Sequence, residues 1–170
     1  MTGTWRVRPA TADDAGSLAA LLNDIIAKGG STAHLRPFDR DRMLAHYIRP
    51  PLLIACTMAE DADGALGFQT LEWCDPDWPG PEALPSDWAV IASFVAARAR
   101  GTGVGRALWQ VSLGAARAAG VRSIDATIRA DNAGGLGYYS ALGFIDYDRL
   151  LALPLSDGRP VDRVRKRFDL

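Results

Sequence analysis

Apolar and polar residues along the chain recur with two different periods, and these periods predict an order of helices and strands. Apolar residues repeat every three to four positions over 11–29 and 104–120, the second with Val104, Leu108, Val111 and Ala115, which indicates two amphipathic helices. Shorter helices are expected over 39–48 and 132–142. Segments that alternate in polarity, or are continuously apolar, predict strands at 4–8, 52–56, 65–73, 88–95, 122–129, from 143 onward, and 161–168.

This order of elements predicts an α/β fold in which strands outnumber helices. A chain of 170 residues is long enough to bury one core, and neither an internal repeat nor an interdomain linker interrupts it. We therefore expect a single domain over 1–170. The proline-rich stretch at 74–86 is expected to be a loop of restricted freedom between two strands.

Charge and cysteine content exclude several classes of function. The formal net charge of −1 gives no electrostatic reason to expect nucleic acid or an anionic membrane as a partner. Cys56 and Cys74 lack metal-ligand spacing, so we expect neither a metal site nor a disulfide framework. No apolar run reaches the length of a membrane span, and the first residues lack the apolar segment of a signal peptide. These features predict a cytoplasmic protein.

Basic residues nevertheless gather in two places. Arg98, Arg100 and Arg106 surround the end of the 88–95 strand and suit an anionic ligand. The second group lies close to the C-terminus and is expected to form the solvated face of an edge strand, with contacts in a homodimer as the alternative: Arg163, Arg165, Lys166 and Arg167.

Three glycines at alternate positions mark the junction between the 88–95 strand and the following helix: Gly101, Gly103 and Gly105. Glycine permits positive φ angles and close approach to the backbone. A helix N-terminus adds unpaired N–H donors and the positive end of the helix dipole. The junction is therefore predicted to bind a phosphate or pyrophosphate, and a turn that only connects strand to helix is the alternative.

The order of residues in this junction narrows the class of ligand. The dinucleotide pattern G-x-G-x-x-G fails because Arg106 occupies the third glycine position, and no Gly-Lys-Ser/Thr follows as in a Walker A loop. The remaining pattern, Arg-x-x-Gly-x-Gly at 100–105, closely resembles the acetyl-CoA pyrophosphate loop of the GCN5-related N-acetyltransferase (GNAT) superfamily.

A second segment resembles the other signature of that superfamily. Asn132 follows the 122–129 strand, Tyr139 lies seven residues later, and Gly143 and Phe144 complete the motif. Two signatures in this order are far more specific than either alone. The resemblance extends from 88 to 144 and implies a mixed, mostly antiparallel sheet, splayed between its fourth and fifth strands and flanked by about four helices.

The resemblance also implies a co-substrate and the residues that contact it. Acetyl-CoA is the expected acetyl donor, without a metal. The expected cofactor contacts are Phe94, Val95, Arg100, Gly101, Thr102, Gly103, Val104, Gly105, Arg106 and Asn132.

Roles in catalysis follow from the chemistry of a thioester. Direct attack by an amine generates an oxyanion, and the resemblance implies that the backbone N–H of Val95 stabilises it. A phenol with a pKa near ~10 can donate a proton to the departing thiolate, which makes Tyr139 the candidate general acid. Tyr138 is the expected packing residue of the pair. By resemblance Asn132 would bind the pantetheine amide, and a simple helix N-cap is its alternative.

The general base and the acceptor are less defined by the sequence. Candidate bases are His34, Glu72, Asp75 and Asp87, and a chain of water molecules is the alternative. Tryptophans near the proline-rich loop are expected to line an acceptor pocket or to form a small core of their own: Trp73, Trp78 and Trp88.

The helix and loop over 23–33 are also similar to the phosphinothricin and amino-acid N-acetyltransferase branch. This similarity favours an N-acetyltransferase that acts on the primary amine of a small, amino-acid-like molecule. The alternatives are a protein or peptide N-acetyltransferase, which needs an open groove, and a non-catalytic acyl-CoA sensor, which would not need Tyr139.

Overall fold

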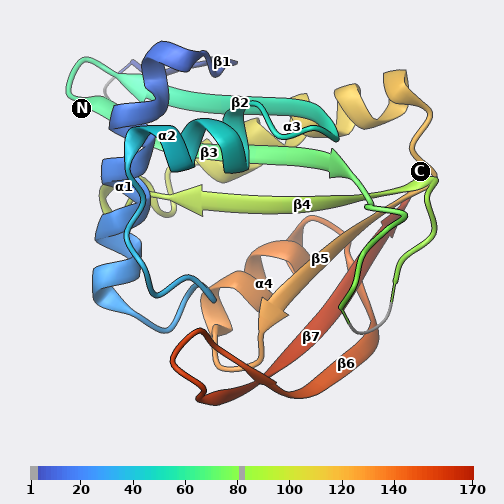
Figure 1. Cartoon of the computed structure of the whole chain (residues 1–170). Coiled ribbons are helices and arrows are strands. Elements are labelled where there is room, and N and C mark those ends of the chain that lie inside the picture. Colours follow the sequence, from blue (N-terminus) through green and yellow to red (C-terminus); the bar gives the residue numbers. More distant parts are fainter. Residues whose placement is uncertain (1–3, 81–82) are drawn as a thin grey trace.

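Seven strands form one mixed sheet in the computed structural model, which describes residues 4–80 and 83–170 (Figure 1). In space the strands are ordered β1-β2-β3-β4-β5-β7-β6. Their bounds are β1 (Arg6–Pro9), β2 (Leu53–Asp61), β3 (Gly64–Trp73), β4 (Trp88–Val95), β5 (Ser123–Arg129), β6 (Ile145–Pro154) and β7 (Pro160–Asp169). Strands β4 and β5 pair in parallel, and the other neighbours pair antiparallel. The predicted α/β fold with a mixed, mostly antiparallel sheet is confirmed.

The helices of the described chain occur in the predicted order. They are α1 (Ala15–Lys28), α2 (Arg40–Met43), α3 (Val104–Ala119) and α4 (Ala133–Ala141), with short turns η1 (Ala12–Asp14), η2 (Leu44–Ile48) and η3 (Ala97–Ala99). The helix expected over 39–48 is divided, because η2 is a π-turn in which the Arg49 amide donates to the Leu44 carbonyl at 2.7 Å. No helix in the described residues is long and apolar enough to cross a membrane.

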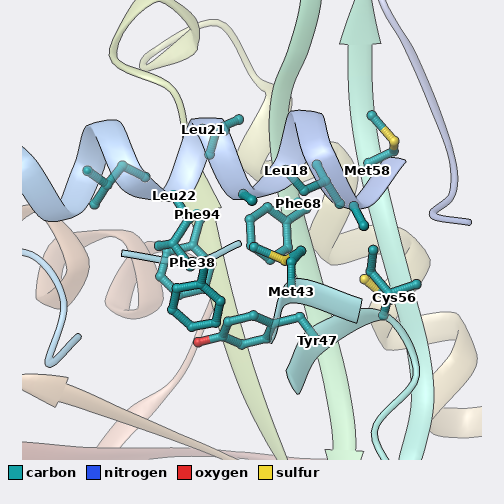
Figure 2. Close-up of a cluster of buried hydrophobic side chains, with 14 residues drawn as sticks. Leu18, Leu21, Leu22, Phe38, Met43, Tyr47, Cys56, Met58, Phe68 and Phe94 are labelled. Carbon is teal, nitrogen blue, oxygen red and sulfur yellow. The ribbon is translucent and has the colours of Figure 1, made fainter. Parts of the chain in front are cut away.

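Helix α1 covers one face of the sheet and forms the larger core there (Figure 2). Leu18 and Leu22 of α1 are fully buried against strands β3 and β4, which contribute Phe68 and Phe94. Each such side chain stabilises the fold by about 1.5–3 kcal/mol through burial. Tyr47 of η2 closes this core, and its ring contacts Phe94 at 5.4 Å between centroids.

Helix α3 packs on the opposite face, and its apolar stripe differs from the prediction. Val111 is 43% exposed, so its assignment to the buried stripe is wrong. The helix instead buries a row of residues four apart, together with a neighbouring apolar pair: Val104, Leu108, Ser112 and Ala116, with Trp109 and Leu113. Because Ser112 is small and buried, this row lies close to the sheet and turns Val111 toward solvent.

Strands β4 and β5 separate soon after they pair. Their ladder covers only three residues of each strand, 88–90 against 123–125, whereas β3 and β4 stay paired up to Val95. Figure 1 shows the two strands leaving one corner of the molecule and diverging, with α4 beside the gap. The predicted splay between the fourth and fifth strands is therefore present.

The prediction for the basic segment near the C-terminus is wrong. Strand β7 lies between β5 and β6, so the edges of the sheet are β1 and β6. Arg165 and Lys166 are only 7% and 5% exposed. Lys166 is neutralised by Asp146, and Arg165 lies 3.7 Å from a carboxylate oxygen of Asp148. This segment is an interior strand whose charges are largely paired.

Candidate active site

A cleft of about 770 Å³ opens where β4 and β5 diverge. Its walls come from β4, β5, the η3–α3 junction, α4 and the loop that follows α1. Arg100, Arg106, Arg129 and Arg163 line it, and no Asp or Glu among the described residues does. The cleft is therefore a site of positive charge, which suits an anionic ligand.

The side chains of β4 alternate between two sides of this cleft, because successive side chains of a strand point to opposite faces. Ser93 reaches α4, where its hydroxyl lies 2.7 Å from that of Tyr139. Phe94 points to the other face, into the core under α1, where its ring contacts Phe68 at 5.0 Å. We call these the α4 side and the α1 side of the cleft.

The backbone of β4 alternates in the same way, and this fixes where the Val95 amide points. The amide of Ala96 donates to the Leu66 carbonyl of β3 at 2.8 Å, so the backbone N–H and C=O groups of even-numbered residues face β3. The carbonyl of Asp87 accepts from the Arg122 amide beside β5 at 2.9 Å, so odd-numbered residues face β5. At Val95 strand β5 has moved away, and the N–H is therefore directed into the cleft.

The junction between η3 and α3 presents free amides to the same cleft. Gly101 and Gly103 have φ angles of 75° and 90°, a conformation that other residues adopt only with strain. Gly103 is the N-cap of α3. Within residues 4–80 and 83–170, the amides of residues 103–106 have no hydrogen-bond acceptor. These N–H groups and the helix dipole together form an anion-binding site.

The arginines around the junction have different roles. Arg98 forms a bidentate ion pair with Asp61, at 2.6 and 3.0 Å, which ties the junction to the β2–β3 turn. Arg100 and Arg106 line the cleft and form no ion pair within the described chain. The cationic groups available to an anionic ligand at this junction are thus Arg100 and Arg106, and Arg98 is structural.

Gly105 is small for a packing reason. A Cβ atom there would lie 2.8 Å from a ring carbon of Tyr138. The Tyr138 hydroxyl donates to the Gly105 carbonyl at 2.8 Å, so α4 is fastened to the first turn of α3. Tyr138 thus packs on α3, but Tyr139 is the core member of the pair and Tyr138 is only partly buried, so the sequence did not predict which of the two is more deeply packed.

Tyr139 is the buried member of this tyrosine pair and faces β4. Burial raises the pKa of its phenol, and the Ser93 hydroxyl partly opposes this rise in pKa. The Gln69 amide nitrogen donates to the Ser93 oxygen at 2.7 Å, which leaves the Ser93 proton free for the Tyr139 oxygen. Tyr139 is therefore a protonated phenol. If it loses its proton, the Ser93 hydroxyl can donate a hydrogen bond to the phenolate oxygen.

Asn132 connects α4 to the loop that follows α1. Its carbonyl oxygen accepts from the Gly135 amide at 2.9 Å and caps α4, and its amide nitrogen donates to the Ser31 carbonyl at 3.1 Å. A Cβ at Gly135 would lie 2.5 Å from the same amide nitrogen, which explains a glycine in this helix. The N-cap role is observed, and Asn132 also lines the cleft.

His34 is the candidate base that lies in the cleft. Its Nε2 is 2.6 Å from the Tyr47 hydroxyl, and its ring is surrounded by Phe38 and His46. Burial, reinforced by repulsion from Arg42 and from His46 in its cationic form, lowers the pKa of His34 to about 4. His34 is therefore a neutral imidazole at physiological pH.

The other candidate bases lie outside the cleft lining. Burial raises the pKa of Glu72 on β3, which does not line the cleft. Asp87 is exposed and lies 3.7 Å from Arg122. The Asp75 carboxylate accepts from the Asp77 amide within the proline-rich loop. The structure thus brings His34, but none of these carboxylates, to the cleft.

Neither interpretation of the three tryptophans holds. Trp78 is 53% exposed, Trp88 packs edge-on against Tyr147, and Trp73 packs against the core under α3. None of them lines the cleft, nor does any other described residue of 74–87. The described part of the proline-rich loop, 74–80 and 83–86, is therefore not a wall of this site.

Several residues of the cleft were not singled out from the sequence. Tyr47 and Ser93 each hydrogen-bond to a predicted site residue, and Arg129 and Arg163 line the α1 side. The signal available for Ser93 was its position in an otherwise apolar strand. Arg129 and Arg163 belong to strands whose pairing does not follow from sequence order.

Comparison with known proteins agrees with this geometry. The family model "Acetyltransferase (GNAT) family" matches residues 20–144, and the chain belongs to that family. No curated protein sequence matches the chain. As a member of this family the protein is an acyltransferase, an N-acetyltransferase with acetyl-CoA as donor, and no group of His, Cys, Asp or Glu in the described residues could hold a metal ion.

Solved structures show the same fold over nearly the whole chain. A GCN5-related N-acetyltransferase from Kribbella flavida is 26% identical, covers 98% of each chain and has a TM-score of 0.77. A ribosomal-protein-alanine N-acetyltransferase from Brucella melitensis is 24% identical over 97% of this chain and 99% of its own, with a TM-score of 0.79. A phosphinothricin acetyltransferase from Sinorhizobium meliloti, solved with AcCoA, is 21% identical over 98% and 89%, with a TM-score of 0.79.

Proposed function

We propose that this protein transfers the acetyl group of acetyl-CoA directly to the primary amine of a small molecule. The observation that carries the proposal is the Tyr139 hydroxyl, which meets Ser93 of β4 on the wall of the cleft into which the anion-binding junction opens. If the pyrophosphate of acetyl-CoA binds at the junction, its thioester would lie close to the Tyr139 hydroxyl.

The junction and β4 would hold the two ends of the donor. The free amides of 103–106, with Arg100 and Arg106, suit the pyrophosphate. The pantetheine arm would continue between β4 and α4. The Val95 N–H would then donate to the thioester oxygen as it becomes an oxyanion, and Phe94 would lie beside it.

Tyr139 would complete the reaction as general acid. When the amine nitrogen bonds to the carbonyl carbon and the carbon–sulfur bond breaks, the thiolate takes the phenolic proton. The Ser93 hydroxyl can then donate to the phenolate oxygen, and the amide product loses its extra proton to water or to the phenolate.

The acceptor has to reach the carbonyl as a free amine. The conjugate acid of His34, with a pKa of about 4, is far more acidic than an ammonium with a pKa near ~10, so His34 is a weak base for this purpose. Because no carboxylate of the described residues lines the cleft, we propose that water removes the proton and that the enzyme selects the neutral amine.

Two observations support a small acceptor. The Asn132–Ser31 and Arg129–Thr32 hydrogen bonds, at 3.1 and 3.0 Å, fasten the loop after α1 to the start of α4 and the end of β5, so this loop is a fixed wall of the α1 side. One structural neighbour is a phosphinothricin acetyltransferase. Another is a ribosomal-protein-alanine N-acetyltransferase, so a peptide acceptor is the alternative that has to be tested.

Thiol release from acetyl-CoA tests the proposal with a panel of amino acids, polyamines, aminoglycosides and peptides with free N-termini. We expect turnover with one class of small amines, and mass spectrometry of the product should show one added acetyl group. Turnover only with peptides would favour the alternative acceptor. Binding of acetyl-CoA without turnover of any amine would favour a sensor.

A further inference from the structure

Two arginines that line the cleft lie directly opposite each other on neighbouring strands. Arg129 at the end of β5 is the cross-strand partner of Arg163 on β7, and both line the cleft. Like charges in directly opposed positions destabilise a sheet. The repulsion between the two guanidinium groups must therefore be offset by nearby acidic groups or by a bound anion.

The two charges are compensated unequally. Arg129 forms a bidentate ion pair with Asp131, at 2.7 and 2.9 Å, and donates to the Thr32 carbonyl at 3.0 Å. Arg163 has no ion pair or hydrogen bond among the described residues, and its Nε atom is buried. Its strand neighbour Arg167 lies 3.6 Å from an Asp169 oxygen. The uncompensated charge of this strand end is thus the Arg163 guanidinium.

The environment of Arg163 is also unfavourable for a cation. Burial and the charge of Arg129 both lower the pKa of Arg163, although it remains a cation at any physiological pH. No carboxylate of the described residues lines the cleft, so none of the described acidic side chains offsets this charge there. An external anion at this position would relieve both the desolvation and the repulsion.

The pair lies on the α1 side of the cleft, away from the donor site. Ile128, which precedes Arg129, packs into the core with Tyr139, so Arg129 points to the opposite face. The hydrogen bond to Thr32 confirms this, because Thr32 belongs to the loop that carries His34. The free amides of residues 103–106, which form the donor site, lie instead at the N-terminus of α3, on the α4 side. The two positive centres would therefore serve two different ligands.

We infer that Arg163, positioned opposite Arg129, binds a carboxylate of the acceptor, which makes the acceptor an amino acid rather than a simple amine. The inference rests on the proposed acetyl transfer to a small amine. A planar guanidinium accepts a carboxylate in a bidentate manner and thereby fixes its orientation as well as its charge. The carboxylate would hold the amino group at a set distance from the thioester.

Matched acceptors test this inference directly. Steady-state kinetics would compare amino acids with their amides and with the decarboxylated amines, for the native protein and for Arg163→Met. For the native protein we expect kcat/KM to favour the amino acid. In Arg163→Met its KM should rise by about 10- to 100-fold, as expected for a charge-assisted pair, whereas the amides and amines should change less than twofold.

A control variant and a charge reversal sharpen the test. Arg149→Met removes an exposed arginine of β6 that pairs with Asp162 of β7, and it should leave all acceptors unchanged. Arg163→Glu should abolish the preference for the amino acid, because the new carboxylate pairs with Arg129 and repels the carboxylate of the acceptor. A taurine or aminophosphonate series would reveal whether another acidic group is preferred over the carboxylate.

The stability of the free protein separates a binding role from a structural one. If Arg163 serves a ligand, Arg163→Met should raise the melting temperature without substrate, because it removes the repulsion with Arg129 and a half-buried charge. A lower melting temperature, or an equal loss with amino acids and decarboxylated amines, would overturn the inference. If the native protein acetylates amines regardless of a carboxylate, the inference fails and the proposed function stands. If no amine is acetylated, the proposed function fails instead.

Discussion

The two sides of the cleft are built from different materials. The α4 side consists of backbone amides of β4 and α3 and of two tyrosines joined by hydrogen bonds to Ser93 and Gly105. The α1 side consists of long cationic or aromatic side chains on strand ends and on a loop. Backbone groups suit donor binding and thiol release, because these steps are the same for every acceptor. Side chains can be replaced by mutation without changing the backbone, so they suit recognition of one particular acceptor.

The largest effect expected from this difference concerns the two tyrosines. Tyr139→Phe removes the proposed acid and should lower kcat by about 10²–10⁴-fold, with the affinity for acetyl-CoA nearly unchanged. Tyr138→Phe keeps the ring that packs on Gly105 and should lower kcat by less than about tenfold. Thiol release and isothermal titration with CoA would measure both. Equal losses of kcat in the two variants would show that Tyr139 is not the general acid.

The pH dependence of the reaction tests whether the α1 side provides a base. His34 is neutral above a pH of about 4, so its titration cannot shape the rate between pH 6 and 9. Because the free amine is the reacting form, kcat/KM for the acceptor should rise about tenfold per pH unit up to the pKa of the acceptor. A less basic acceptor should reach its plateau at a lower pH. A plateau near pH 7 for every acceptor would instead indicate a base in the enzyme.

Two glycines of α3 offer a matched pair for the α4 side. In Gly105→Ala the new Cβ would meet the Tyr138 ring at 2.8 Å, which should displace α4 and raise the KM for acetyl-CoA several-fold. In Gly114→Ala nothing lies within 4 Å of the new Cβ. This control should leave the KM unchanged and stabilise the helix by about 1 kcal/mol. Kinetics and thermal melting of the two variants would test the contrast.

The smallest effect is expected at Asp87, which the sequence indicated as a candidate base. Its carboxylate is exposed and pairs loosely with Arg122, outside the cleft. Asp87→Asn should change kcat/KM by less than about twofold, and the free energy of unfolding by less than about 0.5 kcal/mol. A loss of tenfold or more in kcat/KM would show that Asp87 takes part in the reaction, as a general base would.

The sequence predicted the α4 side better than the α1 side, for a physical reason. The α4 side is formed by short segments whose conformation depends on local sequence, namely the glycine spacing at the junction and the tyrosine pair in α4. The sequence of residues 88–144 is therefore enough to predict this side. Strand β4 is observed with its predicted bounds, and α3 and α4 within a residue of theirs.

The α1 side depends on contacts between distant parts of the chain. Insertion of β7 between β5 and β6 brings Arg163 opposite Arg129, and no local pattern specifies that pairing. The same insertion buries the basic segment that was expected at an edge. His34 was visible as a candidate, but its low pKa comes first from burial, and the π-turn that places the Tyr47 and His46 rings against it is a contact between distant parts of the chain.

The alternation of β4 restricts how this strand can change in length. Ser93 serves one side of the cleft and Phe94 the other, so insertion or deletion of a single residue would exchange the two sides along the rest of the strand. The loop at 74–87, whose described residues lie outside the cleft, has no such restriction. Among relatives with other acceptors we therefore expect length variation in the connections and a constant length in β4.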